Sequence, residues 1–405
     1  MIPVAEALAR LLEPLRPLAA EQVALTNALG RVLAEDVAAR RTQPPAAVSA
    51  MDGYAVRAAD AAQIPARLAV VGSIPAGQAL GRAIGPGEAA RIFTGAPVPE
   101  GADAIVLQED AERPELGTVI IREAPSPGRH IRPAGLDFRC GEVGLASGRL
   151  LTARDIGLAA AMNHPWLWVR RRPRVAILAT GDEIVMPGEP VGPNQIVSSN
   201  ALALAALVTA CGGVPTLLGI AHDDRASLER AAAGAAGADL FVTTGGASVG
   251  EHDLVREALA GAGLALDFWK IAMRPGKPLM VGNVHGTRLI GLPGNPVSSL
   301  VCGLVFVKPA VERLLGLAPP AETSEMARLA MPLPANDGRQ DYLRAECRRG
   351  ADGMLEASPF ARQDSSMLST LARAHCLVIR PPLAPAAPAG SSVPILRFAV
   401  DRFAI

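Results

Sequence analysis

The run DLFVTTGGASVGEHD, residues Asp239–Asp253, joins two patterns that indicate what kind of fold this chain has. Its first half is a short apolar run with the length and composition of a buried strand. Its second half supplies three glycines and small residues, which let backbone N–H groups approach a ligand closely. A helix that begins after such a loop favours an anion at its start. Gly-rich turns between strands and helices are also common, so an ordinary turn remains the alternative for this loop taken alone.

Strand-like and helix-like segments alternate on both sides of this run. The predicted strands are RVAILAT (174–180), VPTLLGI (214–220), LMVGN (279–283) and RLIGL (288–292). The predicted helices are SNALALAALVTA (199–210), with Asn200 as its N-cap, DDRASLERAAAGA (223–235), HDLVREALAGAG (252–263), and a long helix from Pro296 to about Gly316. This alternation predicts a doubly wound α/β domain over residues 173–318.

The flanking regions have different textures. Helical spacing of apolar residues in VAEALARLLEPL (4–15), ALGRVLAEDV (28–37) and TARDIGLAAAMN (152–163) predicts a helical N-terminal domain formed by residues 1–45 and 146–172. Between these two pieces, residues 46–145 alternate short β-rich runs with Pro/Gly turns, which is typical of an inserted β domain. Residues 326–405 carry short strands and turns and are expected to form a small β-barrel.

Composition excludes several classes of function. The chain has 405 residues, with 39 basic and 39 acidic side chains and only 3% aromatics, so nothing global favours nucleic-acid binding. The five cysteines are odd in number and contain no CxxC pair, which favours a reducing, cytoplasmic compartment. The long apolar runs are broken by Gly and Pro, and the first twenty residues form an amphipathic helix. We therefore expect neither a membrane segment nor a signal peptide.

Three predicted strands end in unusual loops that should meet at one edge of the sheet, because ligands bind beyond the carboxyl ends of strands in such folds. The loops are Gly181-Asp182-Glu183, then Thr244 with Gly245, Gly246, Ser248 and Gly250, and finally Pro293-Gly294-Asn295-Pro296. Ser248 adds a hydroxyl donor. The glycine loop lacks the Lys-Ser/Thr ending of a P-loop and the spacing G-x-G-x-x-G, so an ordinary ATPase or a nicotinamide dehydrogenase is disfavoured.

Acidic and basic side chains surround these loops. The acids are Asp182, Glu183, Asp223, Asp224, Glu251 and Asp253. Carboxylates beside a phosphate-binding loop are explained by a Mg²⁺ ion, which is usually held by one or two carboxylates together with phosphate oxygens. For Asp223 and Asp224 the alternative is helix capping. The cations Lys270, Arg274 and Lys277 lie in WKIAMRPGKP, where prolines restrict the backbone; they are either an oxyanion clamp or ordinary surface charges.

Six motifs occur together in the order found in one known family. They are SAMDGYA (49–55), FTGAPVPEGADAIV (93–106), TGDE (180–183), TTGGASVGEHD (243–253), MRPGKP (273–278) and GLPGNPVSS (291–299). In this combination, which covers essentially the whole chain, the sequence resembles the molybdopterin molybdenumtransferases. These are the MoeA proteins, and they are similar to the E domain of gephyrin.

The resemblance implies an elongated, four-part subunit and a homodimer whose active site is shared between subunits. It also implies the last step of molybdenum cofactor synthesis: adenylylated molybdopterin binds with Mg²⁺, molybdate is inserted at the dithiolene, and AMP is released. An adenylyltransferase would then deliver the substrate.

Matching the motifs residue by residue implies further roles. Asp182, Glu183 and Asp253 would lie around the pterin substrate and hold Mg²⁺, with Asp223 beside them. Ser298, Arg344 in GRQDYLRAE, and Ser365 and Ser366 in RQDSSMLST would join Lys270, Arg274 and Lys277 in binding the oxyanion. Asp52, Thr94 and Asp137 match functional positions of the family in the inserted domain, which would face the partner's cleft. For Asp52 a simple turn in MDGY is the alternative.

The chain departs from the family at three places. Ala46-Ala47-Val48 stands where the family usually has Phe-Asp-Asn, Arg274 occupies a position that is often Lys, and Ala247 replaces a common Val. Two other classes of function agree less well with the sequence. An adenylyltransferase would share only residues 173–318, and a scaffold or binding protein would need interaction regions that this chain lacks. Molybdate and tungstate are both tetrahedral dianions, and the sequence does not distinguish them.

Overall fold

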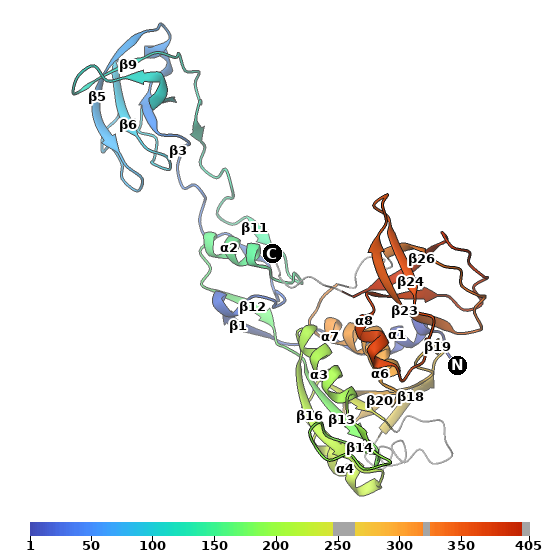
Figure 1. Ribbon diagram of the computed structural model, residues 1–405. Helices are drawn as coiled ribbons and strands as arrows, with labels where there is room; N and C mark the ends of the chain where they lie inside the picture. Colours follow the sequence, from blue (N-terminus) through green and yellow to red (C-terminus); the bar gives the residue numbers. More distant parts are fainter. Residues whose placement is uncertain (246–263, 319–324, 399–405) are drawn as a thin grey trace.

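The computed structural model describes residues 1–245, 264–318 and 325–398. The protein is elongated and has four groups of elements (Figure 1). A small β sheet lies at one end, a compact group of short strands with one helix lies in the middle, and an α/β sheet and a β-barrel lie side by side at the other end.

The α/β sheet is the scaffold of the candidate site. Its six strands lie in the order β16 (Val214–Ala221), β13 (Arg174–Thr180), β17 (Leu240–Thr244), β21 (Thr287–Leu292), β20 (Pro278–Val284) and β18 (Leu264–Lys270). The first four strands are parallel to one another, whereas β20 and β18 are antiparallel to their neighbours. The predicted α/β domain is therefore present as a mixed sheet, and the doubly wound pattern holds for its parallel half.

Helices cover both faces of this sheet, and the residues of β13 show why. Val175, Ile177 and Ala179 point to one core, and Ala176 and Leu178 point to the other. The first core contains residues of α1, α3, α6 and α7; the second contains residues of α4. A strand buried on both faces needs the continuous apolar run that the sequence shows. The helices are α1 (Val4–Leu12), α3 (Asn200–Ala210), α4 (Arg225–Ala233), α6 (Pro296–Cys302) and α7 (Lys308–Leu314), with a π-helical turn between the last two at Gly303–Val307.

The N-terminal part is mostly β, so the prediction of a helical N-terminal domain is wrong. Only α1 and α2 (Ala153–Ala161) are α-helical there. The remaining elements are a 3₁₀ turn at Leu25–Asn27 and the strand pairs β1 (Ala20–Ala24) with β12 (Trp166–Arg170), and β2 (Val37–Ala38) with β11 (Val143–Leu145).

The segment 28–37 illustrates the reason. Val32 and Leu33 form bridges to Leu150 and Val169, which are far away in sequence, and Gly30 has a left-handed φ of +69° that interrupts a helix. These long-range pairings outweigh the helical spacing of the apolar residues. Helix α1 instead packs on the α/β sheet, where Val4, Ala7 and Leu11 are buried.

The inserted region is a β sheet of its own. Its strands lie in the order β7 (Ala104–Leu107), β4 (Gly53–Val56), β6 (Glu88–Ile92), β5 (Ala66–Ile74), β9 (Thr118–Ile121) and β8 (Ala111–Glu112). The short pair β3 (Val48–Ser49) and β10 (Ile131–Arg132) connects it to the middle of the molecule (Figure 1).

The C-terminal region is a closed β-barrel, as predicted. The strands β23 (Gln340–Arg349), β24 (Leu355–Pro359), β22 (Glu325–Leu329), β26 (Ser392–Arg397) and β25 (Cys376–Arg380) follow one another, and β25 pairs back with β23. The short strand β19 (Met273–Arg274) joins β23, and helix α8 (Leu368–Arg373) adds Leu371 to the core of the α/β sheet. Barrel and sheet thus share a core. Among the described residues, no helix is both long and apolar enough to span a membrane.

Candidate active site

The carboxyl ends of the parallel strands meet at one edge of the sheet, as the sequence predicts. Thr180 of β13 pairs with Ala221 of β16, and Thr244 of β17 pairs with Ala179 on one side and Leu292 of β21 on the other. The loops that follow these strands therefore start at nearly the same height. We call this set of loops the strand edge.

Gly245 shows that the start of the glycine loop requires glycine. Its φ is +98°, and a Cβ atom there would lie 2.2 Å from the carbonyl oxygen of Thr180. A side chain is excluded both by the backbone conformation and by space, so Gly245 brings its backbone close to β13. The predicted site residues Gly246, Ser248, Gly250 and Asp253 lie outside the described residues, as does Glu251.

Asn200 connects the end of β17 to the loop after β21, a contact that the sequence did not predict. It was predicted to cap α3, but the N-cap position belongs to Ser199, and Asn200 is the first residue of the helix. Its Nδ2 donates instead to Thr244 Oγ1 at 3.0 Å and to the carbonyl oxygen of Gly294 at 2.7 Å. The only signal in the sequence is a lone amide at the start of a very apolar helix, and a cap explains that equally well.

Three acids gather on the strand edge. Asp182 Oδ1 accepts hydrogen bonds from the backbone N of Asp223 at 3.2 Å and from His222 Nδ1 at 3.0 Å, and these bonds lower the pKa of Asp182. Partial desolvation raises the pKa of Asp223, and the charges of Asp182 and Glu183 raise it further. The neighbouring Asp224 caps α4 by accepting from the backbone N of Ser227, so the capping alternative holds for Asp224.

The acids form an open, negative patch rather than a closed metal cage. The side chains of Asp182 and His222 are 67% and 76% exposed. Within the described ranges, no group of three or more His, Cys, Asp or Glu side chains is arranged to hold a metal ion by itself. Such a patch suits a hydrated Mg²⁺ ion, which keeps several waters and uses one or two carboxylates.

The predicted cations behave differently from one another. Lys270 and Lys277 are exposed. Arg274 is held by the barrel: its Nε donates to Asp341 Oδ1 at 2.8 Å, and its other nitrogens contact Asp337, Asn336 and the second oxygen of Asp341. Its charge is directed at carboxylates, so these contacts do not support an anion-binding role, which stays a prediction.

Arg344 contacts no carboxylate in the part of the chain that the structure describes. It is fully buried, and its Nε and Nη1 have no hydrogen-bond partner in the described part of the chain. Its Nη2 donates to the carbonyl oxygen of Asp364 at 3.1 Å, and Gln363 holds its backbone at both ends. Burial lowers the pKa of Arg344, because a buried guanidinium loses its hydration.

The loop beside Arg344 connects it to the strand edge. Ser365 accepts a hydrogen bond from Asn295 Nδ2 at 3.0 Å on its Oγ, and its carbonyl oxygen accepts one from the backbone N of Val297. Ser298 is buried in the adjoining first turn of α6, between Pro296 and the rest of the helix. Ser366, by contrast, donates its Oγ–H to Asp364 at 2.7 Å. Thus Arg344, Ser365 and the loop after β21 form one connected cluster.

The remaining predicted residues lie in or near the inserted region. Asp52 Oδ1 accepts from both the backbone N and the Oγ of Thr94, each at 2.7 Å, and these bonds lower the pKa of Asp52. Asp137 is exposed and follows the short connection to the middle of the molecule. The inserted sheet is well separated from the strand edge of the same chain (Figure 1). Within one chain the structure therefore does not bring these three residues to the others.

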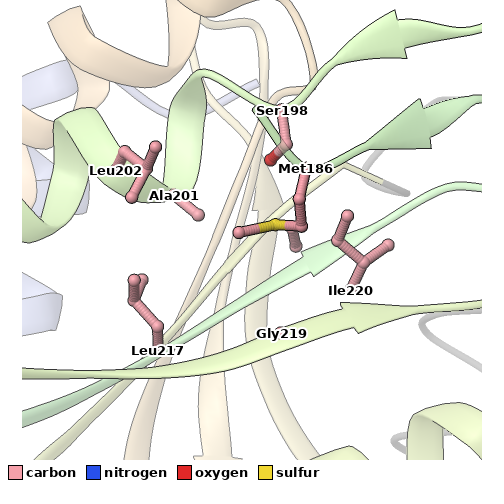
Figure 2. Close-up of a pocket in the computed structure, with 8 residues that line it drawn as sticks. Met186, Ser198, Ala201, Leu202, Leu217, Gly219 and Ile220 are labelled. Atoms are coloured by element: carbon pink, nitrogen blue, oxygen red, sulfur yellow. The ribbon is translucent and has the colours of Figure 1, made fainter. Parts of the chain in front are cut away.

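A small, shallow hollow lies between α3 and β16, beside the strand edge. Figure 2 shows Met186, Leu202, Leu217 and Ile220 lining it, with Ser198 at the rim. Its lining is apolar and carries no charged side chain. An anionic ligand would lose its hydration there without compensation, so this hollow is not the oxyanion site.

Comparison with known proteins identifies the family. Three family models match successive parts of the chain: the MoeA N-terminal region (domain I and II) at residues 2–163, a probable molybdopterin binding domain at 176–313, and the MoeA C-terminal region (domain IV) at 326–398. A molybdopterin molybdenumtransferase 2 from Mycobacterium tuberculosis is 40% identical over 88% of this chain and 89% of its own length. The chain belongs to the MoeA family.

Other MoeA-family relatives agree over similar lengths. The molybdopterin molybdenumtransferase from Haemophilus influenzae is 35% identical over 94% of both chains, and that from Nostoc sp. is 39% identical over 89% of this chain and 85% of its own. A solved structure of a molybdopterin biosynthesis MoeA protein from Pyrococcus horikoshii covers 98% of this chain, with a TM-score of 0.86 and 31% identity. The likeness therefore includes the flanking regions as well as the α/β sheet.

Proposed function

We infer that this MoeA-family chain acts as a molybdopterin molybdenumtransferase in molybdenum cofactor biosynthesis. We further propose the reaction in detail: the protein binds adenylylated molybdopterin at the strand edge, inserts molybdate at the dithiolene, and releases AMP. Family membership supports the first statement. The geometry of the strand edge and of the Arg344 cluster supports the second.

The buried, unpaired guanidinium of Arg344 carries the proposal. A buried cation with free N–H groups is costly unless a ligand pairs with it. Molybdate is a tetrahedral dianion, so it would supply the missing charge and accept hydrogen bonds from Nε and Nη1. Ser365 and Ser298 offer hydroxyl groups nearby, and the exposed Lys270 and Lys277 add positive charge outside. If Arg344 binds the oxyanion, Arg274 can keep its bonds to Asp341 and Asp337 during the reaction.

The acids of the strand edge fit a Mg²⁺ ion. The pKa of Asp223 is raised partly by the charges of Asp182 and Glu183, so the patch carries negative charge that a cation would compensate. We propose that Asp182 and Glu183 hold Mg²⁺, together with Asp253, and that Mg²⁺ would neutralise charge on the phosphate oxygens of the substrate. The protein residues orient the pyrophosphate: Gly245 permits the close approach of the backbone, and Thr244, Pro293, Asn295 and Pro296 shape the wall of the loop.

Asp52, Thr94 and Asp137 are proposed to act on the active site of a second subunit. Their separation from the strand edge of their own chain supports a homodimer with a shared active site, since otherwise these residues would have no substrate to contact. The five cysteines are all unpaired, which supports the reducing cytoplasm as the compartment of the reaction. A molybdopterin adenylyltransferase is the proposed supplier of the substrate.

The decisive experiment measures AMP release from adenylylated molybdopterin in Mg²⁺, with and without molybdate. We expect AMP to appear only when molybdate is present, together with active cofactor. Substrate binding without molybdate-dependent release would contradict the proposal and favour a binding protein. Running the same assay with tungstate determines which oxyanion the Arg344 cluster prefers.

A further inference from the structure

The amide of Asn200 contacts two segments of the strand edge, the end of strand β17 and the loop after β21, which are separated by about fifty residues of sequence. It donates to Thr244 Oγ1 at the end of β17 and to the carbonyl oxygen of Gly294 after β21. Both distances, 3.0 and 2.7 Å, are those of good hydrogen bonds. Both N–H groups of one amide are thus used, one on the strand end at Thr244 and one on the loop at Gly294.

The chemistry of the partners fixes the orientation of this amide. The carbonyl oxygen of Gly294 can only accept a hydrogen bond, so the nitrogen of Asn200 must face it. The hydroxyl of Thr244 can then accept from Asn200 and still contact Ser299 Oγ at 3.2 Å or the carbonyl oxygen of Pro293 at 3.4 Å. Thr244 and Ser299 are 3% and 0% exposed, so water does not readily replace the bond between their hydroxyl groups, whereas the bond from Asn200 to Gly294 lies at the surface.

A role in the helix itself does not explain Asn200. The N-cap position of α3 belongs to Ser199, and within the helix the side chain of Asn200 only accepts a long hydrogen bond of 3.5 Å from Ser199 Oγ on its Oδ1. The side chain leaves the helix and reaches toward the two strands beside it. Its contacts are therefore tertiary, and they stabilise the end of β17 and the loop after β21.

We propose that Asn200 is a positioning residue that fixes the end of β17 at Thr244 against the loop after β21 at Gly294, so that this part of the strand edge keeps one shape when the substrate binds. This inference rests on the proposed function for its kinetic consequence. The structural effect, a more stable end of β17 and a more stable loop after β21, is measured separately from activity. Asn200 acts through Thr244 and Gly294 and does not contact the reacting atoms.

Two variants and one control test the proposal. Asn200→Ala removes the amide, and Asn200→Asp keeps its shape but replaces the donors by a carboxylate that repels the carbonyl oxygen of Gly294. Asn283→Ala is the control: Asn283 Oδ1 accepts from the backbone N of Gly286 at 2.7 Å, in the turn between β20 and β21 at the opposite edge of the same sheet. Thermal unfolding first establishes that all three variants fold.

The first readout is amide hydrogen exchange in peptides covering residues 240–245 and 290–300. We expect exchange to speed up about tenfold in both peptides in the Asn200 variants, since losing hydrogen bonds of this kind frees the loops locally. The Asn283 variant should leave both peptides unchanged. Unchanged exchange in the Asn200 variants would overturn the proposal, whatever the enzyme does.

The second readout separates KM from kcat for AMP release. We expect KM for adenylylated molybdopterin to rise about tenfold in Asn200→Asp, with a smaller change in Asn200→Ala, while KM for molybdate changes less than about twofold. An equal loss for both substrates, or the same loss in Asn283→Ala, would show a general loss of structure and refute the positioning role. If the wild-type protein releases no AMP, the proposed function fails, and the exchange experiment still decides whether Asn200 locks the loops.

Discussion

The acidic and the cationic halves of the candidate site are built in opposite ways. Asp182 and its neighbours lie in the open, where water solvates them and hydrogen bonds from His222 and Asp223 hold them. Arg344 lies fully buried, with two of its nitrogens unpaired. Exposed carboxylates can hold a hydrated cation without losing much solvation, whereas a buried guanidinium has a strong demand for an anion. The acidic half therefore suits a hydrated metal ion, and the cationic half suits an oxyanion that has lost its hydration.

The largest effect should come from Arg344→Met, which removes the buried charge and keeps much of the volume. We expect molybdate-dependent AMP release to fall by about 100-fold or more, the size seen when a preorganised donor is lost. The unfolding temperature should stay equal or rise, because an unpaired buried charge disappears. AMP release by this variant at the wild-type rate would remove Arg344 from the site.

Arg274→Met is the matched control, because Arg274 is an arginine whose charge is already paired. Its partner Asp341 has a side chain only 6% exposed and would lose its counter-charge. We expect the unfolding free energy to fall by about 1–2 kcal/mol, a value reduced from that of a buried pair because Arg274 is half exposed. The activity loss should be smaller than for Arg344→Met, as denaturation and AMP assays run side by side would show. The reverse ranking would mean that Arg274, and not Arg344, binds the anion.

The acidic half is tested by Asp182→Asn and Glu183→Gln. We expect AMP release to fall about tenfold to 100-fold and the Mg²⁺ concentration for half-maximal rate to rise, because one or two carboxylates hold this ion. Glu189→Gln, in the same exposed loop, should change neither quantity; Glu189 Oε2 accepts from the backbone N of Met186 at 2.8 Å. A normal Mg²⁺ titration in both acidic variants would break the contrast between the two halves.

Asp52 is an acid of the inserted region and lies outside both halves. It tests whether the inserted region takes part in the reaction. Hydrogen bonds from Thr94 lower the pKa of Asp52, so Thr94→Val should move that pKa upward. Asp52 then stays protonated to a higher pH, and the acid limb of kcat/KM should shift toward neutral pH. Since the backbone N–H of residue 94 still donates to Asp52 and an ordinary aspartate has a pKa of about 3.9, we expect a loss of about threefold at about pH 4 and none at neutral pH. A pH profile identical to that of the wild type would exclude Asp52 as a group that must be ionised.

The smallest effect is expected at Asp224, which adjoins the acidic half but serves as a helix cap. Asp224→Ala removes the bond to the backbone N of Ser227 and should lower the unfolding free energy by about 1 kcal/mol. AMP release should remain at the wild-type rate in an assay at 25 °C. A marked loss of activity would extend the functional part of the acidic half to this residue.

The amino-acid sequence sufficed wherever the physical cause is local. The apolar runs predict the strands of the α/β sheet because strands buried on both faces need uninterrupted apolar side chains. Gly245 could be predicted as an obligatory glycine because a tight loop after a strand needs a left-handed backbone. The meeting of the strand ends follows from parallel strand order. The same reasoning places Asp182 beside Asp223, whose proximity requires only that the strands before them, β13 and β16, are neighbours.

Long-range contacts decided the rest, and no spacing along the chain contains them. Val32 and Leu33 join a β core because their partners arrive from residues 150 and 169, which cancels a helical pattern. Arg274 and Arg344 look alike in the sequence, yet one meets two carboxylates and the other meets none, since the packing of the barrel against the sheet sets their neighbours. From the sequence alone, Asn200 could cap its own helix. Its amide instead bonds to Thr244 and Gly294, because the fold places these distant residues beside it.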